Sequence, residues 1–312
     1  MPILRVNAGP EGLCLDRSPA APASALRSAA RGTGPIIILI HGFKYDPTCP
    51  RHSPHSRIFA HRTHPDKPGD VAWLRHLGFG IGDADEGLAI AFGWRARGHI
   101  WAAHASAKAA GRQLADMITD LHRHAPTRPI HVMTHSMGSE VIFEALRTLP
   151  AHSIRRIVTI TGASYASSAT AALQSRAGCA AELINITSRE NDLFDFMYER
   201  LIAPPVPFDR AMGCGFDLPN AVTIQLDCAH TLARLSRFGG HVAPARARVC
   251  HWSGYTRPGA LRFYAHCLRT PKATPLAALQ HAVPADPAPR WSRLFARPDL
   301  GTPLPMAQKP AS

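Results

Sequence analysis

Short apolar runs alternate with longer segments of helical periodicity along most of the 312-residue chain. The run PIIILIHG (35–42) has the continuous β-branched character of a strand buried on both faces. A pattern from Ile100 to Arg123 repeats apolar residues at helical spacing. Together they predict an α/β fold in which a mostly parallel central sheet carries helices on both faces. Five further runs have strand character: 88–94, 129–135, 154–162, 182–188 and 221–227.

Composition divides the chain into three parts. Residues 1–34 begin with PILRVNA, which predicts an additional edge strand, and continue as a linker rich in Ala, Ser, Pro and Gly. Residues 35–269 hold the alternating pattern and form the main predicted domain, which ends with a helix at 258–269. Residues 270–312 are rich in Pro and Ala and predict a poorly ordered C-terminal tail, in which only WSRLF resembles a docking patch.

Charge and composition exclude several classes of protein. The net charge is +13, but the basic residues are scattered singly and no nucleic-acid motif accompanies them, so we expect no nucleic-acid partner. No apolar run is long enough to span a membrane and no signal-peptide core is present, which predicts a cytoplasmic protein. The seven cysteines form no CxxC pair, so reduced thiols are expected. We expect no cofactor, and the sequence leaves the oligomeric state open.

Ser136 lies where an apolar strand turns into a helix, in PIHVMTHSMGSEVIFEAL (129–146). A serine hydroxyl is a weak nucleophile that needs exposure, a neighbouring base and stabilisation of the oxyanion it creates. A strand-to-helix turn supplies the exposure, Gly138 permits close packing, and the Met137 N–H points into the site. Thr134 stands at the first position of the G-x-S-x-G pattern, a departure that could crowd the turn. The alternative is that Ser136 is an ordinary small residue at a turn.

An acid and a base are expected further along the chain. SREND (188–192) follows a predicted strand, and its Asp192 is our candidate for orienting a histidine ring. Asp195 lies nearly one helical turn on, where a carboxylate also suits a helix N-terminus. The order serine, acid, histidine favours His251, which directly precedes the last predicted helix, with His241 beside two glycines as the alternative base. The other histidines in this order are His230, His266 and His281.

Four landmarks in this order, IHGF (40–43), THSMG (134–138), SREND and CHWSGY (250–255), resemble the α/β-hydrolase superfamily, in particular its serine esterase and lipase-like branch. The resemblance covers roughly Pro35 to Arg269 and makes 35–269 an α/β-hydrolase catalytic domain. It implies that the backbone N–H groups of Phe43 and Met137 form an oxyanion hole.

The resemblance also implies hydrolysis of a carboxylic ester, or a related acyl bond of a small molecule, through an acyl-enzyme (EC 3.1.1). Ser136 would attack the carbonyl, His251 would accept the serine proton, and Asp192 would orient His251. Between the acid and the last strand, residues 193–219 form either a lid over an acyl pocket or an ordinary packing element.

Two other functions remain open. The chain could be a non-catalytic binding protein that keeps the fold without turnover. It could instead be a metal-dependent hydrolase, because the segment 49–64 gathers several residues of the types that bind zinc. These are Cys49, His52, His55, His61 and His64.

Overall fold

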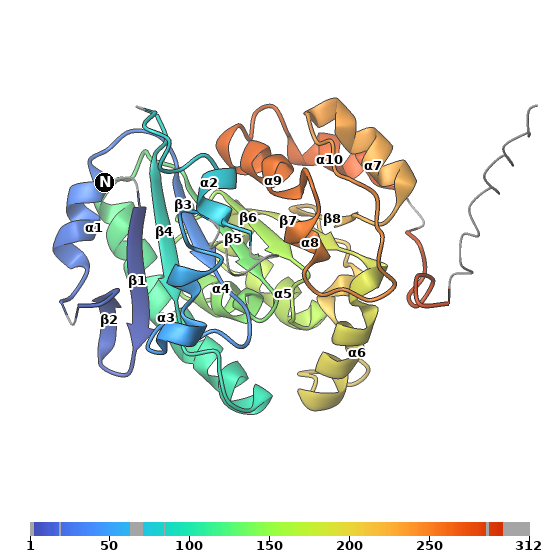
Figure 1. Cartoon of the computed structure of the whole chain (residues 1–312), viewed down its shortest axis with the longest axis horizontal. Helices are drawn as coiled ribbons and strands as arrows, with labels where there is room; N and C mark the ends of the chain where they lie inside the picture. Colours follow the sequence, from blue (N-terminus) through green and yellow to red (C-terminus); the bar gives the residue numbers. More distant parts are fainter. Residues whose placement is uncertain (1–2, 19, 63–70, 84, 285–286, 296–312) are drawn as a thin grey trace, which may run out of the picture.

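The computed structural model describes residues 3–18, 20–62, 71–83, 85–284 and 287–295. One eight-stranded sheet forms its centre, in the order β2-β1-β4-β3-β5-β6-β7-β8 (Figure 1). All neighbouring strands pair in parallel except β1 and β2, which are antiparallel. The strands are β1 (Ile3–Gly9), β2 (Gly12–Leu15), β3 (Ile36–Ile40), β4 (Leu88–Gly93), β5 (Ile130–His135), β6 (Arg156–Ile160), β7 (Glu182–Thr187) and β8 (Ala221–Gln225).

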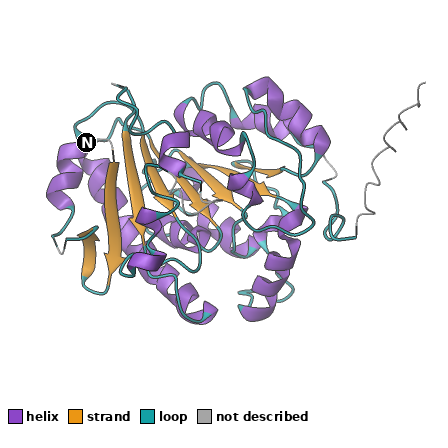
Figure 2. Cartoon of the chain, viewed as in Figure 1, coloured by secondary structure: helices purple, strands orange, loops and turns teal. Residues whose placement is uncertain are grey.

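Helices cover both faces of this sheet (Figure 2), which confirms the predicted fold class. The α-helices are α1 (Ala23–Ala30), α2 (Trp73–His76), α3 (Ile100–His124), α4 (Gly138–Leu146), α5 (Ala166–Leu173), α6 (Asp192–Leu201), α7 (Ala229–Leu235), α8 (Ser253–Thr256), α9 (Ala260–Arg269) and α10 (Leu276–Ala282). Short 3-10 turns are η1 (Pro50–His52), η2 (Pro54–Ser56), η3 (Gly178–Ala180), η4 (Arg189–Asn191), η5 (Met212–Cys214) and η6 (Ser236–Phe238). Within the described ranges, no helix is long and apolar enough to cross a membrane.

The sheet separates two apolar layers, and β3 contributes to both of them. Ile36, Ile38 and Ile40 pack into the layer that includes α3, α4 and α5, whereas Ile37 and Leu39 pack into the layer that includes α7 and α9. Alternate side chains of a strand point to opposite faces, so a strand covered on both sides must be apolar throughout. The continuous apolar run predicted for 35–42 is explained by this position.

The two ends of the chain contain more structure than the sequence predicted. β1 is not an edge strand, because it lies between β2 and β4, and α1 occupies part of the expected linker. The poorly ordered tail also needs correction, since α10 buries Leu276 and Leu279 in the second layer. In both places the helix buries only two or three side chains, so its apolar pattern is too short to stand out in the sequence.

Candidate active site

Ser136 lies at the sharp turn between β5 and α4, at the carboxyl edge of the sheet. Its φ angle is +54°, a left-handed conformation that is strained for a residue with a side chain. The Ser136 N–H donates to the Ile160 carbonyl, and the Ser136 carbonyl accepts from the Ala163 N–H, both at 3.0 Å. These bonds hold the strained turn in place, and Ser136 as a residue is only 5% exposed.

Close packing beneath this turn explains Gly138 and accommodates Thr134. A Cβ on Gly138 would lie 2.7 Å from the His41 carbonyl oxygen and would also collide with the Thr134 hydroxyl. Thr134 is fully buried, and its hydroxyl oxygen has no hydrogen-bond partner in the described part of the chain. The turn therefore tolerates threonine in place of glycine at position 134, because Gly138 has no side chain to collide with the Thr134 hydroxyl.

Two backbone N–H groups near the Ser136 turn, those of Phe43 and Met137, have no hydrogen-bond acceptor among the described residues. Gly42 brings the end of β3 close to the turn, since a Cβ there would lie 2.7 Å from the Ser136 Cβ. Both residues predicted for an oxyanion hole thus flank the serine with unused donors.

His251 lies on the loop before α8, and its backbone carbonyl is held near the serine. That carbonyl oxygen accepts from the Thr161 hydroxyl at 3.2 Å and lies 3.3 Å from Nε2 of His135, the neighbour of Ser136. The His251 ring stacks on Phe194 at 4.6 Å between centroids and approaches the His135 ring at 4.7 Å. Within the described chain, no hydrogen bond joins the His251 ring to the Ser136 hydroxyl. Such bonds often form only when substrate is present.

Burial determines the protonation of this histidine. Removal of the ring from water lowers the pKa of His251 well below its usual range, and nearby His135 lowers it further. Burial also lowers the pKa of His135, to about 4. His251 is therefore neutral at pH 7, the state that a general base requires.

The polar side chain that contacts Nδ1 of His251 is Asn191, not the predicted Asp192. The Asn191 Oδ1 atom lies 2.6 Å from the His251 Nδ1 atom. Asp192 is turned elsewhere: its Oδ1 accepts from Arg189 at 3.1 Å, and its Oδ2 accepts from the Trp291 N–H at 2.6 Å. The prediction identified the correct loop but the wrong residue, because a sequence does not show which residue of a turn points back to the sheet edge.

A buried glutamate ties the histidine loop to the loop of Asn191. The Glu190 backbone carbonyl accepts from the Cys250 N–H at 2.8 Å, and its carboxylate accepts from the Ala247 N–H at 3.0 Å. Arg257 forms a buried ion pair with the same carboxylate. A buried pair of this kind fixes the geometry of two loops more than it adds net stability.

The segment 287–295 packs against the loop that carries Asn191 and the loop that leads to His251. Arg290 forms an ion pair with Glu199 of α6 at 2.9 Å, and the Trp291 N–H binds Asp192. Arg293 donates to the carbonyl oxygens of Ala247, at 3.0 Å, and Ala245, at 2.8 Å. The predicted docking patch thus contacts both α6 and the histidine loop.

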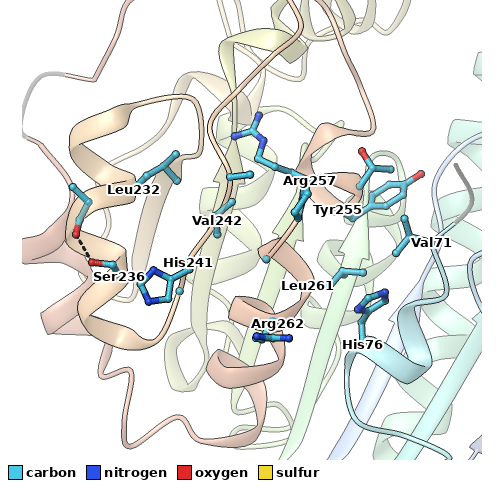
Figure 3. Close-up of a pocket in the computed structure, with 16 residues that line it drawn as sticks. Val71, His76, Leu232, Ser236, His241, Val242, Tyr255, Arg257, Leu261 and Arg262 are labelled. Atoms are coloured by element: carbon cyan, nitrogen blue, oxygen red, sulfur yellow. Dashed lines mark hydrogen bonds between the residues drawn. The ribbon is translucent and has the colours of Figure 1, made fainter.

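His241, the alternative base, lies in a different part of the molecule. It lines a cavity of about 750 Å³ together with His76, Ser236 and Arg262 (Figure 3). Ser136 is not among the residues that line this cavity. The structure therefore brings His251, and not His241, against His135, the neighbour of Ser136.

The histidine-rich segment 49–64 does not assemble a metal site in the described part of the chain, where no group of three metal-binding side chains occurs. His55 instead contacts Asn7 at 2.7 Å, and His61 lies 3.0 Å from the Gly80 carbonyl oxygen. His64 lies outside the described residues.

The order of the strands and the strand–turn–helix at Ser136 define an α/β-hydrolase fold. Residues 24–163 match the family described as alpha/beta hydrolase of unknown function (DUF900), which supports the predicted resemblance to the α/β-hydrolase superfamily. The serine esterase and lipase-like branch stays a prediction. No curated protein matches the chain. The family match includes Phe43 and Ser136, whereas Asn191 and His251 lie beyond it.

Proposed function

We propose that this hydrolase is a serine hydrolase that cleaves a carboxylic ester, or a related acyl bond, through an acyl-enzyme. The observation that carries the proposal is the strained Ser136 turn, which lies between two unused backbone donors and the loop of a neutral histidine. Each part is one that acyl transfer requires: a nucleophile, a base and an oxyanion hole.

In the proposed reaction, the Ser136 hydroxyl oxygen forms a bond to the substrate carbonyl carbon while its proton passes to His251 Nε2. The carbonyl oxygen becomes an oxyanion and accepts hydrogen bonds from the Phe43 and Met137 N–H groups. His251 returns the proton to the leaving oxygen, whose bond to carbon breaks. Water then attacks the acyl carbon while His251 accepts its proton. The bond from carbon to the Ser136 oxygen breaks, His251 returns the proton to that oxygen, and the carboxylic acid leaves.

Apolar side chains beside the site support a small-molecule substrate with an apolar portion. Phe194 of α6 stacks on the His251 ring and lies 6.2 Å from the Trp252 ring. Trp252 is 53% exposed, and Leu193 and Met197 on the first two turns of α6 are 38% and 40% exposed. Apolar surface left open beside a reaction centre suits an alkyl or aryl group of the substrate. This supports a substrate-binding role for part of 193–219.

The cellular location belongs to the proposal as well. All seven cysteines are free. Free thiols support a reducing compartment, and we propose the cytoplasm.

Labelling by a fluorophosphonate probe, which reacts with activated serines, tests this proposal. We expect the native protein to be labelled and Ser136→Ala to be unlabelled. Ser139→Ala is a matched control, because it removes another buried hydroxyl three residues further along the chain, in α4, and should leave labelling intact. Native protein that is folded but unlabelled would instead support a binding protein.

Two further comparisons distinguish His251 from His241 as the base, and the serine mechanism from a metal-dependent one. His251→Ala should abolish labelling whereas His241→Ala should not. Hydrolysis that survives Ser136→Ala but is lost with a chelator would replace the serine mechanism with a metal-dependent one.

A further inference from the structure

A second carboxyl group lies behind the amide that contacts the histidine ring. The Asn191 Nδ2 atom donates to Asp195 Oδ1 at 2.9 Å, while Asn191 Oδ1 faces His251 Nδ1 at 2.6 Å. We propose that Asp195 is a positioning residue, which acts through Asn191 to fix the tautomer of His251. This inference rests on the proposed function, in which His251 accepts the serine proton.

The two ends of the Asn191 amide determine which tautomer of His251 is held. A carboxamide has an acceptor oxygen and a donor NH₂ group, and it can be rotated so that either end faces the ring. Asp195 Oδ1 accepts a hydrogen bond from the Asn191 NH₂ group, so this end of the amide faces Asp195. The oxygen end remains for His251, so the proton of the neutral ring is held on Nδ1. The lone pair of Nε2 is then free for the serine proton.

Helix geometry and burial fix this arrangement. Asn191 and Asp195 are four residues apart, the spacing that places side chains on one face of a helix. They are 1% and 2% exposed, so water does not compete for either group. The backbone of Gly213 packs against Asp195, and a Cβ at position 213 would collide with the carboxyl group. Asp195 therefore has little freedom to turn away from the amide.

The charge state of Asp195 is compatible with this role. The pKa of Asp195 is raised to about 8. Burial is the main cause, Asp192 and Glu199 contribute to the rise, and Arg290 and Arg189 oppose it. At pH 7 the group is mainly a neutral carboxylic acid, whose carbonyl oxygen still accepts from Asn191. Asn191 and neutral Asp195 thus orient the His251 ring through dipoles, and neither places a full charge beside it.

A double-mutant cycle tests the proposal, with fluorophosphonate labelling and hydrolysis of p-nitrophenyl acetate as readouts. Asn191→Ala and Asp195→Ala should each lower kcat, the second by about tenfold, the value of one buried hydrogen bond. Combining the two should cost no more than Asn191→Ala alone, because Asp195 acts only through Asn191. Asp195→Asn retains an acceptor oxygen and should recover most of the native rate.

Asp192→Asn is the matched control, because it alters another buried carboxyl group of the same helix that does not contact Asn191 or His251. Additive losses in the cycle, or native kinetics in Asp195→Ala, would overturn the positioning role while leaving the serine mechanism intact. If the native protein is not labelled, the proposed function fails and this inference fails with it.

The tautomer can also be read directly, should Asp195→Ala not fold. In ¹⁵N NMR of the native protein, with the His251 signals identified by their loss in His251→Gln, we expect the ring proton on Nδ1. A neutral ring protonated at Nε2 would contradict the proposal.

Discussion

The Asn191 Oδ1 atom lies 2.6 Å from the His251 Nδ1 atom, at the place where an ionised acid was expected. An amide oxygen can fix the ring and its tautomer, as a carboxylate does. It stabilises a positively charged imidazolium less, because it offers a dipole instead of a full charge. Burial therefore governs the pKa of His251, since no anion in the described part of the chain raises it.

Replacing this amide by an acid should move the pH dependence of catalysis. Asn191→Asp places a carboxylate beside the ring, which favours the protonated form of His251 and raises its pKa by about one unit or more. We expect the acid limb of the kcat/KM profile to shift to higher pH by a similar amount. An unchanged acid limb, with the variant folded and active, would show that Asn191 does not contact the working base.

The native protein should keep its activity at unusually low pH. Because burial lowers the pKa of His251, the acid limb of kcat/KM should lie below pH 6.5, the usual value for histidine. Phe194→Ala uncovers the ring to water and should shift this limb upward. Phe196→Ala is the control, because Phe196 lies on the same helix as Phe194, but its ring contacts Trp291 and not His251. Equal shifts in both variants would argue against a specific effect on the ring.

The space around Ser136 should tolerate no added carbon at Gly42. A Cβ there would lie 2.7 Å from the Ser136 Cβ and 2.9 Å from the His135 carbonyl oxygen, so the turn must shift. We expect Gly42→Ala to lower kcat by roughly 100-fold, because small displacements of reacting groups are costly. It should also reduce the free energy of unfolding by about 1–3 kcal/mol. Gly32→Ala, whose Cβ would lie 3.5 Å from its nearest neighbour, should change neither.

Asp195 should make the folded protein less stable as the pH rises. Its pKa is about 8 in the folded state against 3.8 without burial, so the folded state binds more protons between these values. Stability from this group is therefore full below about pH 3.8 and declines as the pH rises to about 8. Chemical unfolding of Asp195→Asn across this range should show a smaller loss than the native protein. An identical decline in both proteins would contradict a buried neutral acid.

The sequence was sufficient for the strands β3 to β8 but not for the whole sheet or the whole site. The six strands from β3 to β8 were predicted because strands buried on both faces are continuously apolar. The strand-to-helix turn at Ser136 was predictable because it imposes a local pattern, and the loop of His251 lies against His135, the residue before Ser136. The role of His251 as the base stays a prediction. Asn191 was missed, because its role depends on the side-chain direction of one residue within a turn. An asparagine directly before the expected acid was the only signal in the sequence.

The docking of residues 287–295 gives the C-terminal end of the chain an influence on the reaction centre. Arg290 and Trp291 bind α6, which carries Asp195 and Phe194, and Arg293 holds the loop that leads to His251. An affinity tag or a truncation at this end should consequently alter activity. A recombinant protein that ends before Arg290 would lose the brace on both loops, and its low activity could be mistaken for the wrong substrate.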